Sequence, residues 1–307
     1  MSSSRFPRGG RRGDDRGSRR RGGRRAGPLT GTRAGAGARR GGEYGGTGAI
    51  VAAWALGMVF GLPVAVLLVR AVAGGSLFRA IGNPAVTDAL VLSLVTTACS
   101  LVLTIAIGLP LGLVLARRRF RGKALLETIV DLPIVLPPSV AGLALLLLLG
   151  RRGLLGAPLD VLGITIPFTI VAVVVAQVFL SAPFFIRSAR AGFVSVDRDL
   201  EDAARVDGAR ERDLFRLITV PMAAPALAAG LVMAWARALG EFGATIMFAG
   251  SVAGRTQTLP LLVYGEFGGG DLDSAIAAAA VLVLAVGGVL IAVRGLHWGR
   301  ALDAGAT

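Results

Sequence analysis

The sequence is poor in the side chains that most catalytic and metal sites require. Its 307 residues contain one cysteine, Cys99, one histidine, His297, and one lysine, Lys123. A single cysteine excludes a disulfide framework. A lone cysteine and a lone histidine far apart in the sequence cannot form a zinc site or a nucleophile pair. We therefore expect no metal site and no catalytic residues, and we do not interpret the chain as an enzyme in its own right.

A phosphate-binding loop for ATP is also missing from the sequence. Such a loop has the pattern G-x-x-x-x-G-K-[ST], in which backbone N–H groups and the lysine hold the phosphates. Lys123 follows Gly122, but the pattern would require glycine at Arg117 and serine or threonine at Ala124. If this chain depends on ATP, a separate polypeptide must bind it, and we expect no cofactor in this chain.

Long apolar segments are the main feature that is present. The chain is 54% hydrophobic with a mean hydropathy of +0.69, which is typical of a membrane protein. A helix needs about 20 apolar residues to cross a hydrocarbon core of about 30 Å. We predict an all-α, polytopic membrane protein with six transmembrane helices. The six segments are roughly residues 48–69, 89–116, 124–149, 166–186, 222–248 and 274–293.

The third apolar segment contains three prolines, Pro133, Pro137 and Pro138. Proline lacks a backbone N–H and its ring disturbs the preceding helical turn. The carbonyl groups freed in this way must be satisfied by neighbouring helices or by water in a cavity. We therefore predict a broken or kinked helix here, and Pro137 and Pro138 become candidates for the lining of a path across the membrane.

Positive charge is concentrated at the N-terminus. Residues 1–46 carry 13 arginines and three acidic residues, so they hold +10 of the net charge of +14 and leave +4 for the rest. This segment has too few apolar residues to offset the entropy lost on folding, and we predict a disordered cytoplasmic tail that touches anionic lipid headgroups. Nucleic-acid binding is the alternative, but it leaves the six apolar segments of residues 47–300 unexplained.

The distribution of cations indicates the orientation in the membrane. With the N-terminus inside, the cytoplasmic segments hold 13 + 5 + 7 + 2 = 27 of the 33 lysines and arginines. Cytoplasmic loops of membrane proteins carry such an excess. We therefore expect both termini, and the polar stretch 187–221, to lie in the cytoplasm.

The polar stretch 187–221 separates the fourth and fifth apolar segments. It contains seven arginines and seven carboxylates, with apolar residues between them at spacings of three to four. This pattern predicts short amphipathic helices outside the bilayer. Gly208 interrupts them, and Pro221 is expected to end the last one before the next membrane helix.

This stretch contains Asp202-Ala203-Ala204, then three residues, Gly208, nine residues and Ile218-Thr219-Val220-Pro221. The run resembles the EAA loop of permease subunits in bacterial ATP-binding-cassette (ABC) importers. That loop reads E-A-A, three residues, G, nine residues, I-x-L-P, and the spacing here is the same, with Asp and Val replacing the Glu and the Leu. The resemblance implies a type I importer fold in which this stretch is the coupling helix that docks into an ATPase subunit. The residues to which it assigns this role are Glu201, Asp202, Ala203, Ala204, Gly208, Ile218 and Pro221.

Two opposite charges lie inside the fifth apolar segment. Arg237 and Glu241 are four residues apart, so we expect them to share one helical face and to pair. Either charge alone would cost about 2.5–3.5 kcal/mol in mid-bilayer on insertion scales. The pair either holds helices together or lies near the gate of a path. Gly240 and Gly243 would allow another backbone to approach closely.

A narrower resemblance concerns the solute. Residues 131–156 and 236–264 resemble the permeases for tetrahedral oxyanions, most of all the molybdate branch, and the matching region spans about residues 85–295. Tungstate is not separable from molybdate, and the sulfate branch shares L-G-E-F-G-A. The resemblance implies a homodimer in the cell membrane with two ATPase subunits that bind ATP–Mg and a periplasmic or lipoprotein solute-binding protein. The alternatives are a sulfate permease and a secondary transporter, for which Glu241 is the one mid-membrane acid.

Overall fold

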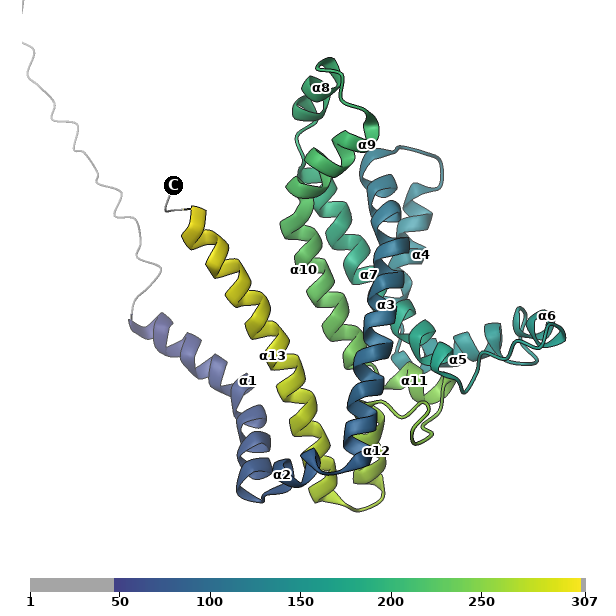
Figure 1. Cartoon of the computed structure of the whole chain (residues 1–307), viewed down its shortest axis with the longest axis vertical. Helices are drawn as coiled ribbons and strands as arrows, with labels where there is room; N and C mark the ends of the chain where they lie inside the picture. The colour runs from purple at the N-terminus through teal and green to yellow at the C-terminus, as the bar shows by residue number, and fades with distance from the viewer. Residues whose placement is uncertain (1–46, 305–307) are drawn as a thin grey trace, which may run out of the picture. The chain divides into compact units, whose positions relative to one another are not determined.

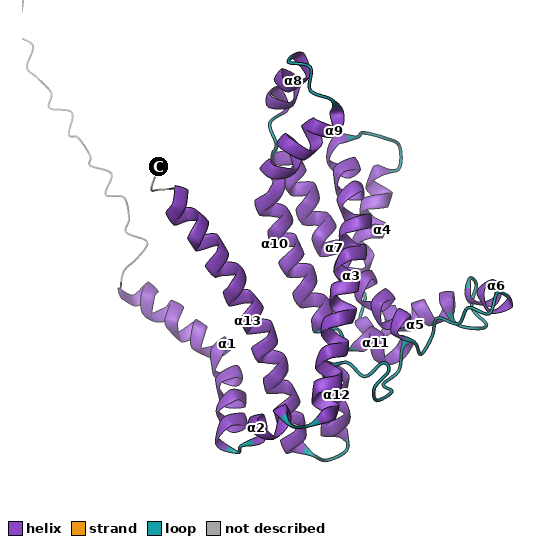
Figure 2. Cartoon of the chain, in the orientation of Figure 1, coloured by secondary structure: helices purple, strands orange, loops and turns teal. Residues whose placement is uncertain are grey.

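The computed structural model describes residues 47–304. The predicted disordered tail, residues 1–46, lies outside the described residues, as do residues 305–307. The described part of the chain consists of helices joined by loops and turns and contains no strand (Figure 2), which confirms the predicted all-α class. The contacts between residues divide the chain after Ala52, and the packing reported below is that of the part from Ala53 onward.

Five stretches of the described chain are long and apolar enough to cross a membrane. They are α1 (Thr47–Ala73), α3 (Pro84–Arg117), α7 (Ile170–Ser195), the stretch Glu211–Leu239 that ends with α10 (Val220–Leu239), and α13 (Leu272–Ala304). A sixth crossing is possible as a bent pair, α4 (Lys123–Val135) and α5 (Pro138–Leu149), whose axes differ by 118°. The shorter helices are α2 (Ser76–Ile81), α6 (Gly156–Val161), α8 (Arg198–Val206), α9 (Glu211–Leu214), α11 (Gly243–Phe248) and α12 (Leu259–Gly268) (Figure 1).

Helices α3 and α7 pack closely and run in the same direction. Gln177 Nε2 of α7 donates to Thr96 Oγ1 of α3 at 3.3 Å. Further along both helices, a Cβ added at Gly112 would lie 2.9 Å from Ala189 Cβ. Residue numbers therefore rise together on the two helices. Small residues at this interface let the backbones approach, as is usual between helices in membranes.

Because α3 and α7 are parallel, the chain between them must return across the membrane. The α4–α5 pair is the helical segment there that passes the length and hydropathy requirement, so we count it as one broken crossing. The break falls at Leu136 and Pro137. Pro138 occupies the first turn of α5, where backbone N–H groups have no partner within the helix, so the missing N–H of proline costs no hydrogen bond. The predicted break at the prolines is confirmed.

The fourth predicted span was too short. We placed its end at Ile186, but α7 continues to Ser195 and thus includes the first nine residues of the polar stretch 187–221. Ala189, Gly192 and Phe193 in this extension are buried against neighbouring helices. Arg187 and Arg190 are good helix formers, so they do not end the helix, and both are paired with carboxylates of α4.

The prediction that Pro221 ends a helix was wrong. A π-helical turn, Phe215–Thr219, joins α9 to α10 without interruption, and the Val220 N–H donates to the carbonyl of Phe215, five residues earlier. A proline ring crowds the carbonyl four residues before it. The wider π-helical turn directly before Pro221 relieves this crowding, so the helix passes through the proline.

The fifth predicted helix, residues 222–248, is also interrupted. α10 ends at Leu239, the chain turns through residues 240–242, and α11 begins at Gly243. The segment between the fifth and sixth predicted apolar segments contains α12, in which Leu259, Leu261 and Leu262 are buried. Leu259 donates its N–H to Ser93 Oγ of α3 at 2.8 Å, so this segment is part of the packed interior.

Candidate functional site

The polar stretch 187–221 folds into two short helices that meet at Gly208. The Asp197 carboxylate accepts the Asp199 N–H at 3.0 Å and begins α8, which ends at Val206. Gly208 has φ 89°, the left-handed conformation that glycine adopts without steric cost. The Ala209 N–H then donates to the Ala204 carbonyl at 2.9 Å, which closes the end of α8. The predicted interruption at Gly208 is therefore a helix C-terminus followed by a turn into α9 (Figure 1).

Arg205 connects the two helices across this turn. Its guanidinium contacts Glu211 through Nε at 2.7 Å and Nη2 at 3.3 Å, and Asp202 through Nη1 at 2.6 Å. These bonds, the one to Glu211 most of all, raise the pKa of Arg205 above its ordinary value. The contacts of Arg205 thus hold α8 and α9 together across the turn at Gly208, and Asp202 is one of the partners.

The two neighbouring carboxylates of the motif have different surroundings. The Glu201 side chain is 8% exposed, accepts from Arg117 Nη2 of α3 at 2.7 Å, and accepts the Thr219 hydroxyl of the π-helical turn at 2.7 Å. The Asp202 side chain is 69% exposed. Glu201 therefore connects α8 to α3 and to the π-helical turn before α10, whereas Asp202 lies at the surface and pairs with Arg205 of its own helix.

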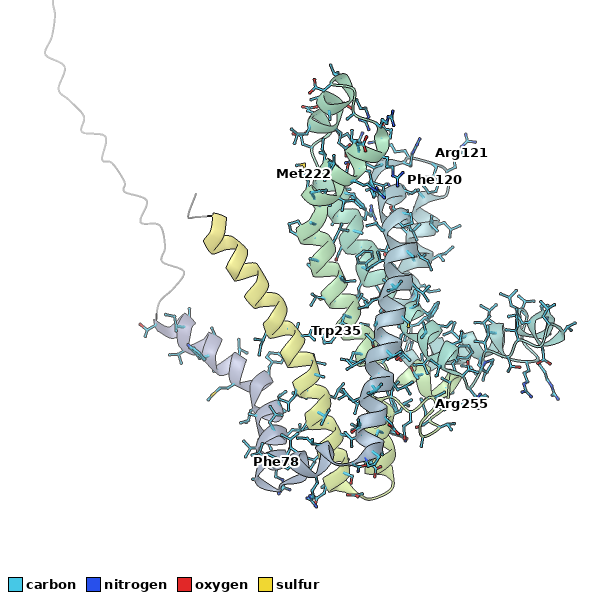
Figure 3. All side chains as sticks on the ribbon, viewed as in Figure 1. Phe78, Phe120, Arg121, Met222, Trp235 and Arg255 are labelled. Carbon is cyan, nitrogen blue, oxygen red and sulfur yellow. The ribbon has the colours of Figure 1, made fainter. Side chains whose placement is uncertain are left out.

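The outer surface of this region combines charge with apolar side chains. Leu200 and Val206 of α8 and Leu217 of the π-helical turn are exposed, together with Ala203. A cavity of about 560 Å³ opens beside them, with Arg117, Arg118, Arg198, Arg205 and three carboxylates in its wall. The α3–α4 turn with Phe120 and Arg121 lies at the same end of the helices (Figure 3). Such a surface is suited to contact with another protein.

The remaining residues assigned to this stretch lie in or beside it. Ala204 and Ile218 are half-buried, and Pro221 is exposed near the start of α10. Glu201, which the motif itself does not require, has the most extensive contacts. Its partners Arg117 and Thr219 are 84 and 18 residues away in the sequence, so no local pattern pointed to them.

Arg237 and Glu241 form the expected ion pair, but not on one helical face. Arg237 lies in the last turn of α10, while Glu241 lies beyond the end of that helix in the turn to α11. The Glu241 side chain is 1% exposed and also accepts the Ala244 N–H at 2.7 Å. Glu241 thus joins the end of α10 to the start of α11, a role that we did not foresee.

The break between α4 and α5 meets the break between α10 and α11. A Cβ at Gly243 of α11 would lie 2.7 Å from Pro138 Cβ of α5. Similarly, a Cβ at Gly142 would lie 2.6 Å from the Ala244 carbonyl oxygen. Gly243 therefore permits the expected close approach, whereas the nearest described atom to a Cβ at Gly240 is Ala236 O of its own helix, at 3.4 Å. Gly142 was missed, although its spacing of four from Pro138 places both on one face of α5.

Of the gate candidates, the structure thus brings Pro138, Glu241 and Gly243 together, with Pro137 at the N-cap of α5. Gly240 supplies the turn after α10 rather than an interhelical contact. The part of the chain that the structure describes holds no group of three or more His, Cys, Asp or Glu side chains that could bind a metal ion. The chemistry available at this junction is therefore charge pairing and backbone packing.

The family is decided by comparison with known proteins. Residues 108–297, more than half of the chain, match the family described as the binding-protein-dependent transport system inner membrane component. The chain belongs to this family. The permease is 41% identical to the molybdenum transport system permease protein ModB of Mycobacterium tuberculosis over 77% of this chain and 89% of that protein. It is 39% identical to ModB of Escherichia coli K12, over 66% of this chain and 90% of that protein.

Further relatives agree in fold. The molybdate/tungstate transport system permease protein WtpB of Pyrococcus abyssi is 37% identical over 72% of this permease and 82% of that protein. A chain of a bacterial ABC transporter that imports alginate superimposes with a TM-score of 0.62 at 18% identity, covering 82% and 93% of the two chains. For the MetNI methionine ABC transporter the TM-score is 0.54 at 20% identity, over 70% and 95%. These structures confirm the predicted fold of a type I ABC importer permease.

Proposed function

We propose that this permease is the membrane subunit of an ABC importer that carries molybdate or tungstate into the cell. The observation that carries this proposal is the 41% identity to a molybdenum permease over 89% of that protein. The relative named for both molybdate and tungstate supports a site that accepts either oxyanion. The absence of a phosphate-binding loop in the sequence fits a subunit that uses ATP bound elsewhere.

The coupling to ATP is proposed to occur at α8, Gly208 and α9. Asp202, Ala203 and Ala204 would contact the ATPase subunit, because Asp202 and Ala203 are exposed there next to unpartnered apolar side chains. Glu201 would transmit movement, since it holds α8 to Arg117 of α3 and to Thr219. Ile218 and Pro221 lie in and just after the π-helical turn through which such movement would reach α10.

The gate is proposed to lie where the break between α4 and α5 meets the break between α10 and α11. Pro137 and Pro138 lie at the first break, and residues 240–242 form the second. Arg237 and Glu241 hold the second interruption in its present conformation. A discontinuous helix at membrane depth is tolerated where it lines a cavity or is buried in protein, which is consistent with this location.

The complete importer is proposed to contain two copies of this chain and two ATPase subunits that bind ATP–Mg, with a solute-binding protein on the outer side. The chain would lie in the cell membrane in contact with lipid, with both termini in the cytoplasm. The cations of the α3–α4 turn and of the α8–α9 region, at one end of the helices, support this orientation.

The test is the ATPase activity of the reconstituted importer. The complex with its cognate ATPase and binding protein is placed in liposomes, and hydrolysis is measured with molybdate, tungstate or sulfate. We expect stimulation by molybdate and tungstate but not by sulfate. Stimulation by sulfate alone would favour the sulfate permease. Uptake that follows a proton or sodium gradient without ATP would instead indicate a secondary transporter.

A further inference from the structure

Helices α4 and α7 carry a ladder of opposite charges that the proposed coupling and gate sites do not include. Arg187 Nε of α7 donates to Asp131 Oδ1 of α4 at 2.6 Å. One turn nearer the α8 end, Arg190 Nη1 lies 3.1 Å from Glu127 Oε1, a charge contact without the alignment of a hydrogen bond. Lys123 Nζ lies 3.8 Å from the same oxygen. The two helices lie side by side (Figure 1), so these contacts form a continuous row.

The Arg187–Asp131 pair of this ladder, the one farther from α8, lies at membrane depth. Ile186, next to Arg187, would be 3.1 Å from a Cβ at Gly108 of α3. Gly108 precedes the charged end of α3 at Arg117 by nine residues, or about 13 Å at 1.5 Å per residue. Ser188 lies against Gly230 of α10, which follows Arg216 by 14 residues, or about 21 Å. The Arg187 rung is therefore level with the apolar parts of α3 and α10.

These charges are not covered by the rest of the described chain. The exposed fraction of the side chain is 56% for Arg187, 41% for Arg190 and 33% for Asp131. A cavity of about 420 Å³ opens along this face, and Val130, Ala191 and Val194 line it beside the four charged residues. Charged side chains in membrane segments face water or protein rather than lipid, because transfer into hydrocarbon is costly. The face must therefore meet something other than lipid.

We propose that the α4–α7 ladder lines the water-filled path between the gate and the α8 end of the permease, and that Arg187 and Arg190 guide a divalent oxyanion along it. This inference rests on the proposed function. α4 leads from the ladder directly to the break at Pro137 and Pro138, and Pro138 contacts Gly243 at the second break. One face thus runs from the proposed gate to the end where α8 lies. A second copy of this chain supplies the opposite wall.

The carboxylates give the ladder the weak binding that a path requires. Two bare arginines would hold a dianion tightly and delay its release, whereas ions cross a path only if each site is favourable enough to enter and weak enough to leave. Asp131 and Glu127 each occupy one side of an arginine and leave the other side accessible, as the exposed fractions indicate. The oxyanion therefore meets partly neutralised cations in succession.

Thiol labelling tests whether water reaches the α4–α7 face and whether the electrostatic potential there is positive. Cys99 is first replaced by serine, and Val130→Cys places a thiol beside Asp131 on the lined face. Ile107→Cys is the control, because this exposed residue adjoins Gly108 at the same depth on α3. The full chain with its ATPase subunit is labelled in inverted membrane vesicles with a sulfonate-bearing methanethiosulfonate and with its trimethylammonium analogue. We expect both reagents to label Val130→Cys and neither to label Ile107→Cys, with the anionic reagent reacting faster.

A second comparison tests whether the two arginines create the positive potential. Adding Arg187→Gln and Arg190→Gln to Val130→Cys should lower the ratio of anionic to cationic labelling rates about tenfold, because both guanidinium charges are removed. Protein that is abundant in the membrane but unlabelled at Val130→Cys would place this face against lipid or tightly packed protein and overturn the proposal. An unchanged ratio would also overturn it. Because labelling needs no transported ion, failure of molybdate and tungstate to stimulate the ATPase would refute the proposed solute and leave this result intact.

Discussion

Gly243 of α11 lies directly against Pro138 of α5, so closely that a Cβ at residue 243 would be 2.7 Å from the proline Cβ. Each of the two residues begins a helix that follows a break in the chain. The neighbouring Gly142 contacts the Ala244 backbone in the same way, so α5 and α11 are packed against each other at more than one residue. Movement at one break must therefore displace the other, which makes this contact the mechanical centre of the proposed gate.

Replacing Gly243 by alanine should disturb this contact strongly. The added methyl group meets Pro138 Cβ at 2.7 Å and the Ser139 nitrogen at 3.2 Å, so we expect a loss of about 1–3 kcal/mol in stability, as for other overpacked sites. Molybdate uptake should fall as well. Gly240→Ala is the matched control, because its methyl group would come no closer than 3.4 Å to a described atom. Equal melting temperatures of the two variants in detergent would contradict this account.

Removing one partner of the Arg237–Glu241 pair should be worse than neutralising both. Arg237→Gln leaves the Glu241 carboxylate buried without its cation, and loss of one partner of a buried pair typically costs about 3–5 kcal/mol. In the double variant with Glu241→Gln no charge remains, and the Gln carbonyl can still accept the Ala244 N–H. A double-mutant cycle on thermal unfolding measures the coupling. Additive losses would show that the two side chains act independently.

Glu201 and Asp202 should give different phenotypes although they are adjacent. Glu201→Gln weakens the bonds to Arg117 and Thr219 and leaves the arginine partly unpaired, so we expect a loss of about 1–3 kcal/mol. Asp202→Asn changes an exposed residue and should alter stability by less than about 0.5 kcal/mol while reducing recovery of the ATPase subunit. The checks are thermal unfolding of the purified permease and co-purification of the ATPase. If Asp202→Asn lowered stability and Glu201→Gln reduced only recovery of the ATPase subunit, Asp202 would be the anchoring residue and Glu201 the docking residue.

Gly208→Ala should impair coupling to the ATPase because it strains the backbone conformation of the turn, and not because the added methyl group collides with neighbouring atoms. None of the described atoms lies within 4 Å of a Cβ at Gly208, but its φ of 89° costs a residue with a side chain about 1–2 kcal/mol. Gly122→Ala is the control, because Gly122 has φ 87° and equally open surroundings in the α3–α4 turn. Both variants should lose similar stability, but Gly208→Ala should also lose stimulation of ATP hydrolysis by loaded binding protein. If binding protein stimulated ATP hydrolysis equally in the two variants, the α8–α9 turn would have no part in coupling.

Acid should loosen the start of α13. The Ser274 N–H donates to Asp271 Oδ1 at 3.0 Å and the Ser274 hydroxyl donates to Oδ2 at 2.7 Å, and these bonds lower the pKa of Asp271 below its ordinary value. Because the folded pKa is lowered, the stabilisation is complete above the ordinary pKa and is lost as the pH falls through the lowered one. Asp271→Asn should flatten the acidic part of the profile of melting temperature against pH, whereas Asp273→Asn, which keeps both bonds, should retain its slope.

The sequence by itself determined the class of protein, the location of its apolar segments and the motif of the coupling stretch. These features depend on local composition and spacing, which is why the turn at Gly208 was predicted at the correct residue. Of the three prolines at which a break or kink was predicted, Pro137 and Pro138 lie at the break, whereas Pro133 lies inside α4. The pairing of Arg237 with Glu241 was predicted as well, although Glu241 lies beyond the end of α10 rather than on the same helical face.

Only the tertiary structure decided where helices end and which charges are buried. α7 continues to Ser195, and the residues of this extension such as Ala189 and Phe193 are buried against neighbouring helices. α10 continues through Pro221 because a π-helical turn relieves the crowding by the proline ring. Glu201 is buried while Asp202 is exposed, although a local pattern treats them alike. The physical reason is that burial and pairing depend on partners far away in the sequence, and a residue's partners are known only once the helices have packed.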